Sequence, residues 1–489
     1  MLAVAAVLAL AVGPGTLRAQ RIIPESTPDP QITGFRFPES EATITSWVAS
    51  LSRGDAAESA VAAEKIQLHG WGLWTALTKE TGQLYEGQVL RVFETWLTPE
   101  DLRGPAATRS LAMLAQSPRQ RAPLQDVVEL QPAPSIRLPK GRRSLRTSAF
   151  EAEPAPEPAL TPDPDMADRL TGFVKYDPSA AEHILRQDLF NAGALNALLL
   201  GGAQGIPPFP STSLVVKPLF QVMRLSTLVE GRYFALRTWE GPPATPQPMP
   251  PTQWPGVVWI DLLGSGSGIG DVDTVAARDG SSRTDATTYP LSGLLHYRLS
   301  AADAAALNAD QPGTNARAGD IALLVAMHVA GREIARWTWQ SFWWTPNPDD
   351  PPAPSSPAIA SQRPNQLRGA ARNYAMAQTY TMLIPDPPYV GGGNVGAAVY
   401  AYNPWFEARF GPKDLPDSLP GWDPSGQPAT NNHGVQSNCM SCHAQATYNP
   451  RGLSTAPRFA GARYVDLTDP QFVGTLQVDF LWSIARHAR

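Results

Sequence analysis

Apolar residues recur at helical spacing in the first hundred residues of the chain. One stretch within 38–100 places them three to four positions apart, the spacing of one face of an α-helix. These positions are Ala62, Ile66, His69, Leu73, Trp74 and Leu77. Asp55, with Glu58 three residues later, is typical of a helix N-terminus. The pattern therefore predicts a helical region over 38–100, with His69 on the apolar face of its main helix.

The pattern changes further along the chain. Asp177 followed by Pro178 predicts a helix start, because proline is well tolerated at the first helical position. In that helix we expect His183 at the surface. From residue 213, short runs rich in β-branched and aromatic residues predict strands. These runs cover 213–226, 232–240, 256–263, 291–299, 320–330 and 333–344. We therefore expect an α+β fold with a helical N-terminal part, a strand-rich middle and an irregular or helical C-terminal segment.

Composition divides the chain into five segments. Residues 1–19 have the form of a signal peptide, and 20–118 make up the N-terminal helical region. Residues 119–165 join a basic half to an acidic, proline-rich half without apolar periodicity, which predicts a linker or a long exposed surface loop. The strand-rich α+β region covers 166–364, and the C-terminal region, which carries the motif described below, covers 365–489.

The first residues have the pattern of an export signal. Leu2 to Val12 form an apolar run that a Gly-Pro-Gly breaker ends, and Ala19 precedes a plausible cleavage position at Gln20. The run is shorter than the ~20 residues needed to span a bilayer. No Lys or Arg precedes it, so a buried N-terminal helix is the alternative. We expect an exported protein, periplasmic in a bacterium, with no transmembrane segment in the mature chain.

Composition also narrows the functional classes. The chain has 489 residues with 39 Lys and Arg against 44 Asp and Glu, a formal net charge of −5. No basic excess is available to neutralise a phosphate backbone, so we expect no nucleic-acid partner. The 50 prolines argue against long uninterrupted helices and exclude a simple helical bundle. Only 2 cysteines are present, which excludes a disulfide framework.

Both cysteines lie in one short motif. Residues 438–443, Asn-Cys-Met-Ser-Cys-His, contain the C-x-x-C-H spacing that marks attachment of c-type haem. Two thiols at this spacing can add across the two vinyl groups of the porphyrin, and the adjacent imidazole then reaches the iron as proximal ligand. Thioether attachment takes place outside the bacterial cytoplasm, in agreement with the export signal. We expect one covalent haem c, held by Cys439, Cys442 and His443.

Three other interpretations of these residues stay open. A disulfide between Cys439 and Cys442 would close a very small loop and stabilise little. A thioredoxin-like site also uses C-x-x-C, but it belongs in a βαβ context that the flanking residues do not predict. A zinc site would add His433 to Cys439, Cys442 and His443, although two directly adjacent ligands strain tetrahedral geometry.

The chain resembles the bacterial exported cytochrome c family proteins, which are large chains with a single haem motif near the C-terminus. The resemblance is carried by 402–407, Tyr-Asn-Pro-Trp-Phe-Glu, and by 437–443, Ser-Asn-Cys-Met-Ser-Cys-His. It is looser over 69–74 and 337–343. The family implies haem binding and electron transfer. Only its haem motif transfers roles to residues here: thioether attachment to Cys439 and Cys442, and proximal ligation to His443.

The motif does not set the ligand on the other face of the iron. No methionine follows His443, so we expect an upstream ligand or a five-coordinate iron. His328 lies in a predicted strand and shares its face with Ala326 and Ala330, which leave room for a large group. We predict His328 as the distal candidate, with a hydrogen-bonded core histidine as the alternative. His69 is the next candidate and has the same alternative.

The tryptophan-rich strand has two interpretations. Trp337, Trp339 and Trp343 project to one side at period two, and Phe342 and Trp344 project to the other. The pattern is typical of a sheet buried on both faces. It would also suit an aromatic wall that excludes water from a haem and so sets its potential.

Two functions from different classes follow. The first is electron transfer through the covalent haem to an unidentified redox partner protein, which the motif supports directly. The alternative is a haem enzyme of peroxidase or oxygenase type with an open distal site. Most of the chain lies outside a minimal haem module, and an aromatic-rich fold could shape a substrate site.

Overall fold

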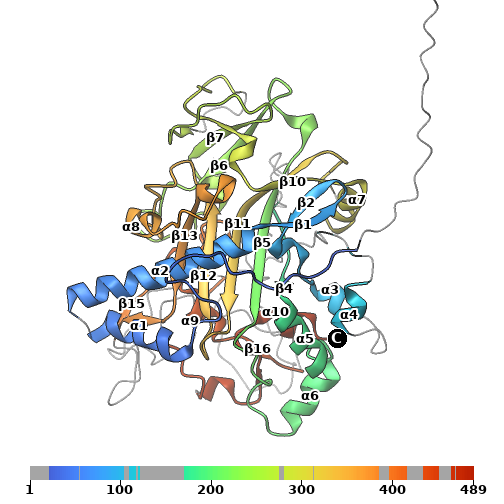
Figure 1. The fold of residues 1–489 in the computed structure, drawn as a ribbon, viewed down its shortest axis with the longest axis vertical. Coiled ribbons are helices and arrows are strands. Elements are labelled where there is room, and N and C mark those ends of the chain that lie inside the picture. The colour runs from blue at the N-terminus through green and yellow to red at the C-terminus, as the bar shows by residue number, and fades with distance from the viewer. Residues whose placement is uncertain are drawn as a thin grey trace, which may run out of the picture.

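The computed structural model describes most of the chain between residues 21 and 489. The described ranges are 21–53, 55–103, 110–116, 119, 121, 170–274, 280–311, 313–384, 396–412, 414–415, 433–450, 464–468 and 470–489. Helices and several antiparallel sheets occur together in them, which confirms the predicted α+β class (Figure 1). The predicted signal peptide lies outside the described residues. In the ranges above, no helix is both long and apolar enough to cross a membrane.

Seven strands form the central sheet. They are β3 (Leu170–Gly172), β4 (Lys175–Tyr176), β5 (Leu214–Met223), β10 (His296–Arg298), β11 (Ile321–Gly331), β12 (Thr338–Trp344) and β13 (Tyr374–Thr379). The main path runs β13-β12-β11-β5-β3, while β10 pairs with β11 and β4 with β5. The long strands β5, β11 and β12 are buried along nearly their whole length. This confirms strands in the predicted runs 213–226, 320–330 and 333–344, although β12 begins only at Thr338. It also confirms the interpretation of a sheet buried on both faces.

Helix α2 (Ala56–Thr78) covers one face of this sheet, which we call the α2 face. Figure 1 shows α2 in blue, running across the long strands. Asp55 caps the helix by accepting from the backbone N–H groups of Ala57 and Glu58, as its position in the sequence predicts. Trp74 stacks on Phe342 of β12 with ring centroids 4.3 Å apart. Large apolar rings on both elements therefore seal this face.

The opposite face, which we call the motif face, carries the candidate site. Strand register places Lys217 opposite His328, His328 opposite Ser341, and Ala330 opposite Trp339. Side chains paired in this way project to the same side of a sheet. The C-terminal elements α9 (Cys439–His443), β16 (Thr447–Tyr448), β17 (Leu476–Gln477) and α10 (Trp482–His487) belong to the part of the chain that packs here. Met440 and Ala444 join Trp339 in one hydrophobic cluster.

Smaller elements surround the central sheet. A second sheet contains β6 (Tyr233–Thr238), β7 (Gly256–Asp261), β8 (Asp273–Thr274) and β9 (Thr288–Pro290), and hairpin β14 (Leu383–Ile384) pairs with β15 (Ala397–Ala398). The other α-helices of the described residues are α1 (Glu41–Arg53), α3 (Pro99–Leu102), α4 (Leu111–Leu114), α5 (Pro178–Gln187), α6 (Ala192–Leu200), α7 (Ala301–Asp310) and α8 (Pro357–Ser361). Helix α5 begins at Pro178 with Asp177 as its cap, which confirms that predicted start.

Two sequence predictions are wrong in this part of the chain. The helical region predicted over 38–100 is interrupted: its main helix ends at Thr78, the hairpin β1 (Glu80–Tyr85) with β2 (Gln88–Arg91) follows, and then come only the short helical turns Val92–Thr95 and α3. In β1 exposed positions alternate with partly or fully buried ones, a period-two pattern that a helical period does not capture. His183, predicted at the surface, is buried because its Nε2 donates to the carbonyl of Pro207 and its ring packs on Phe209.

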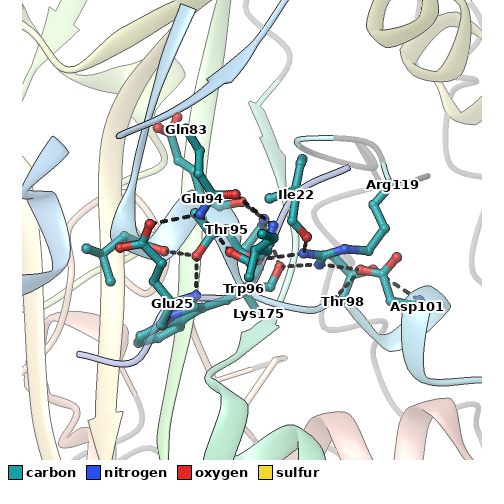
Figure 2. Close-up of polar contacts among 12 residues, drawn as sticks. Ile22, Glu25, Gln83, Glu94, Thr95, Trp96, Thr98, Asp101, Arg119 and Lys175 are labelled. Carbon is teal, nitrogen blue, oxygen red and sulfur yellow. Dashed lines mark hydrogen bonds and ion pairs between the residues drawn. The ribbon is translucent and has the colours of Figure 1, made fainter. Parts of the chain in front are cut away.

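The segment predicted to begin an exposed linker also differs at the residues that are described. Arg119 and Arg121 are both buried. Arg119 donates to the carbonyls of Ile22, Thr95 and Trp96, and lies 3.6 Å from a carboxylate oxygen of Asp101 (Figure 2). Arg121 pairs with Glu94 at 2.6 Å. Long-range carbonyl and carboxylate partners therefore hold two arginines that their local sequence marks as exposed; the rest of 119–165 lies outside the described residues.

Lys175 completes this buried network at the edge of the central sheet. Its Nζ donates to the carbonyls of Glu94 and Trp96 (Figure 2). Burial lowers the pKa of Lys175 to about 7, and the positive charge of Arg119 adds to the shift. The network ties the N-terminal segments to β4 and through it to β5.

Candidate haem c attachment site

The C-x-x-C-H motif forms the single turn of α9, and Asn438 fixes where that turn begins. The side-chain oxygen of Asn438 accepts from the backbone N–H of Ser441 at 3.1 Å, as an N-cap does. Its amide nitrogen donates to Thr379 Oγ1 at 3.2 Å, to the carbonyl of Thr381 at 3.3 Å and to that of Val399 at 2.8 Å. One fully buried side chain therefore ties the motif to the end of β13 and to the strand segment near β15.

Ala401 holds the first cysteine of the motif. Both the backbone N–H and the thiol of Cys439 lie 3.1 Å from the carbonyl of Ala401. In return, the N–H of Ala401 donates to the carbonyl of Ser437 at 3.0 Å. These bonds place the segment 402–407 directly beside the motif, so the two stretches that carry the family resemblance lie together in the fold.

The imidazole of His443 is oriented by a backbone carbonyl and an aromatic ring. Its Nδ1 lies 2.7 Å from the carbonyl oxygen of Phe480. Because a carbonyl only accepts, Nδ1 carries the proton and Nε2 keeps its lone pair. Trp339 packs on the imidazole with ring centroids 4.2 Å apart. A histidine that donates through one nitrogen and presents the other is arranged as a metal ligand.

Burial shapes the protonation of all three motif residues. Burial raises the pKa of the Cys439 thiol well above its usual value and that of Cys442 to about 12. Burial lowers the pKa of His443 to about 4, so the imidazole is neutral at pH 7. By their exposed surface, however, the three side chains are only half-buried. They therefore reach the protein surface in part, while protein surrounds most of each group.

These protonation states bear on the other interpretations of the motif. The two cysteines are not joined by a disulfide. A thioredoxin-like site needs a thiolate with a lowered pKa, whereas both pKa values here are raised. A zinc site needs several ligands around one point, and in the described part of the chain no three His, Cys, Asp or Glu residues are grouped to hold a metal ion. The structure favours none of the three.

The same residues fit haem c. Attachment needs two reduced thiols one helical turn apart and an imidazole whose Nε2 is available to iron. Cys439 and Cys442 meet the first need. His443 meets the second, because no described residue bonds its Nε2 while Phe480 holds Nδ1.

His328, the predicted distal ligand, lies on the motif face with both ring nitrogens hydrogen-bonded. Its Nδ1 lies 2.8 Å from Ser341 Oγ, and its Nε2 lies 3.0 Å from Glu407 Oε1. Phe406 stacks on the ring with centroids 4.2 Å apart. Ligation of iron by His328 would require one of these two bonds to open, so its distal role stays a prediction.

Glu407 is bonded from two sides. Besides His328, the backbone N–H of Asn403 donates to its second carboxylate oxygen at 2.6 Å. Burial alone would raise the pKa of Glu407. The charge and hydrogen bond of His328, with smaller contributions from the Asn403 backbone and the charge of Lys217, offset this effect and hold the pKa below its usual value. Asn403 also donates from its side chain to Ser341 Oγ at 2.7 Å. Ser341, His328, Glu407 and Asn403 therefore form one closed network.

His69 belongs to the core, as the alternative interpretation held. Its Nδ1 lies 2.5 Å from the hydroxyl of Tyr380 and its Nε2 lies 3.1 Å from Glu333. Only 2% of His69 is exposed. Both ring nitrogens of His69 are therefore engaged, and neither is available to a ligand.

Sequence reasoning missed Asn403, Glu407 and Ser341 as neighbours of the motif. A signal for the first two was present in the resemblance over 402–407. That resemblance named a stretch of sequence without saying what it contacts. Ser341 had no signal, because a serine among tryptophans in a strand is unremarkable until register places it opposite His328.

Comparison of the chain with protein-family models, with curated proteins and with solved structures found no match in any of the three.

Proposed function

We propose that this protein is an exported mono-haem c-type cytochrome that transfers electrons through one covalently attached haem to a redox partner protein. The observation that carries the proposal is the C-x-x-C-H turn, whose thiols are reduced and whose histidine donates through Nδ1 to Phe480. When bound, haem c supplies a one-electron Fe(III)/Fe(II) couple. The predicted export signal supports the compartment, since thioether attachment takes place outside the bacterial cytoplasm.

The residues around the motif have separate roles in this function. Phe480 fixes the tautomer and the direction of His443, and a donated hydrogen bond raises the basicity of a metal-ligating imidazole. Trp339 covers one side of the same imidazole and keeps water from it. Asn438 holds the turn against the sheet, so that the two cysteine sulfurs would keep one position in both oxidation states of the haem.

A haem enzyme with an open distal site is the second candidate. The observation that favours it is that both nitrogens of His328 bond to Ser341 and Glu407. If those bonds persist in the holoprotein, the iron has an open face. His328 and Glu407 would then be an acid–base pair on the same side of the sheet as the motif.

The attachment test uses protein expressed with its leader in a bacterial host that carries the cytochrome c maturation machinery. We expect periplasmic protein that keeps haem after denaturation. Cys439→Ala or Cys442→Ala should weaken attachment, and the double variant should abolish it. Met440→Leu, which keeps the buried volume between the cysteines, is the control. Haem that stays covalently bound in the double variant would contradict the proposal.

The absorption spectrum of the holoprotein then separates the two candidates. A low-spin, six-coordinate haem that does not bind carbon monoxide supports electron transfer. A high-spin haem that binds carbon monoxide or reacts with peroxide supports the enzyme.

A further inference from the structure

Three cations on or near the motif face have no ion-pair or hydrogen-bond partner among the described residues. Lys217 lies on β5 directly opposite His328 in the strand register. Arg409 comes two residues after Glu407, and its guanidinium lies over the ring of Phe410. Arg486 lies on α10. Arg336, by contrast, donates to the carbonyl of Val465 and to the hydroxyl of Tyr464.

Ring contacts and backbone position place these cations near the haem motif. Lys217 Nζ lies 4.9 Å from the ring centroid of Phe406, the same ring on which His328 stacks. Arg486 lies on the helix that directly follows Phe480, whose carbonyl orients His443.

The charges are also close enough to affect one another. Burial lowers the pKa of Lys217 to about 8; the negative charge of Glu407 opposes this shift, and the positive charges of Arg486 and Arg409 add to it. Burial is likewise the main cause of the lowered pKa of His443, and the charge of Lys217 contributes to it. The three cations and the motif therefore share one electrostatic environment.

Among the described residues, the carboxylate whose charge acts on Lys217 is that of Glu407, and its oxygens are already engaged. Glu407 accepts from His328 at 3.0 Å and from the Asn403 backbone at 2.6 Å, and it forms no ion pair with Lys217.

Lys217 and Arg409 are partly buried, whereas the side chain of Arg486 is exposed and free to reach a ligand. A partly buried cation without a direct ion pair is costly, and a bound anion relieves that cost. A haem joined to two cysteines through its vinyl groups still has two free propionate carboxylates. Their number and charge suit the unpaired cations.

We propose that Lys217 and Arg486 bind the two haem propionates, with Arg409 adding to the positive potential around them. This inference rests on the proposed function, because it needs a haem at Cys439 and Cys442. Arginine suits a carboxylate through its planar fork of donors, while lysine binds as a compact point charge. Together they would turn the propionate edge of the haem toward β5 and α10.

The test compares Lys217→Gln, Arg486→Gln and the double variant with the wild-type holoprotein. Lys65→Gln, which removes an exposed lysine of α2, is the control for a general change of charge. Lys217→Arg keeps the cation. The readouts are the haem reduction potential by spectroelectrochemistry and the propionate bending bands by resonance Raman spectroscopy. A haem stain after denaturing electrophoresis scores covalent attachment separately.

Loss of a cation beside a propionate stabilises the oxidised haem, which carries one more positive charge. In each single glutamine variant we expect the ratio of oxidised to reduced haem at a fixed electrode potential to rise about tenfold, or ~59 mV for one electron. The propionate bands should move in these variants, and the double variant should show the larger shift. Lys217→Arg and Lys65→Gln should resemble the wild type.

Two outcomes would overturn the inference and leave the proposed function standing. The first is unchanged potentials and propionate bands in both glutamine variants with haem attached. In the second outcome, added succinate shifts the potential of the wild type but not that of Lys217→Gln, and the propionate bands are the same in both proteins. This result would assign the cations to an external carboxylate. Wild-type protein without covalent haem would overturn the proposed function and this inference together.

Discussion

Each face of the central sheet holds a histidine bonded between a hydroxyl and a glutamate, but the two trios have different surroundings. On the α2 face, His69 lies between Tyr380 and Glu333, and only 2% of its side chain and 0% of that of Glu333 is exposed. On the motif face, His328 lies between Ser341 and Glu407 with side-chain exposures of 16% and 21% for the histidine and the glutamate.

The same chemistry therefore has different consequences on the two faces. A sealed trio can only contribute to stability, since no ligand reaches it and any missing partner leaves a buried group unpaired. A half-open trio loses less when a partner is removed, because water can replace the partner. It can also change partners. The motif face therefore combines the half-open trio, the cysteines and the unpaired cations.

The largest expected effect tests this difference directly. His69→Ala leaves the buried Glu333 carboxylate without one of its donors, and breaking such a pair costs about 3–5 kcal/mol. We expect a large drop in the free energy of unfolding, measured in urea, with no change in the haem spectrum of the folded fraction. His328→Ala should cost much less. Equal losses in the two variants would remove the distinction between the faces.

The next effect concerns Asn438, which links the motif to the sheet. Asn438→Ala removes a helix cap and three donated bonds, and we expect a loss of about 1–3 kcal/mol together with a lower yield of attached haem. Asn438→Asp keeps the oxygen that accepts from Ser441 but removes the donors to Thr379, Thr381 and Val399. If this variant attaches haem like the wild type, the cap is the important part. If haem attachment fails as in Asn438→Ala, the three donated hydrogen bonds are the important part.

Lys175 extends the comparison to a buried cation whose hydrogen-bond partners are mainly backbone carbonyls. Because burial lowers its pKa to about 7 from 10.5, the folded state releases this proton above about pH 7 while the unfolded chain keeps it to about pH 10.5. Across that window the unfolded state binds more protons, so stability rises with pH. The rise is at most about tenfold in the folding equilibrium constant per pH unit for one linked proton.

Lys175→Met should lack this rise. Urea unfolding of both proteins at a series of pH values from 6 to 10 measures it. Parallel curves for wild type and variant would mean that Lys175 stays protonated in the folded protein through carbonyl bonding alone.

Substitutions of His328 and Ser341 should have the smallest effects on stability, and they test the ligation of the iron most directly. If His328 ligates the iron, as its strand position predicts, His328→Ala should give a high-spin haem that binds carbon monoxide, with covalent attachment intact. Ser341→Ala removes only the group on Nδ1 and should stay low-spin, with a stability loss of about 1 kcal/mol. A spectrum that His328→Ala leaves unchanged would assign the imidazole to the network with Glu407 alone.

Local signals in the sequence predicted much of this fold. The helix starts at Asp55 and Asp177 are visible because capping is a contact between neighbours in sequence. The strands from 213 to 344 are visible because apolar and β-branched residues dominate them. The core position of His69 follows from its helix face, and the motif residues follow from their spacing alone.

The remaining features depend on contacts between residues far apart in sequence. Arg119 is buried because carbonyls of Ile22 and Thr95 surround it, and nothing near Arg119 in the chain shows this. The hairpin after Thr78 is not visible locally, because its two short strands are stabilised by pairing with each other and carry few apolar residues. The partners of His328 depend on strand register and on the position of Glu407, 79 residues away.

The order of synthesis matters for one feature of this fold. A single hydrophobic cluster includes Leu97, Val215 and Trp339 together with Met440 and Ile484. A chain that emerges N-terminus first therefore leaves Val215 and Trp339 without these partners until the segment that carries Met440 and Ile484 has emerged, and contacts this distant in sequence form slowly. The residues proposed to attach haem are among the last to close this cluster. Completion of folding and delivery of haem would therefore compete for the same short segment.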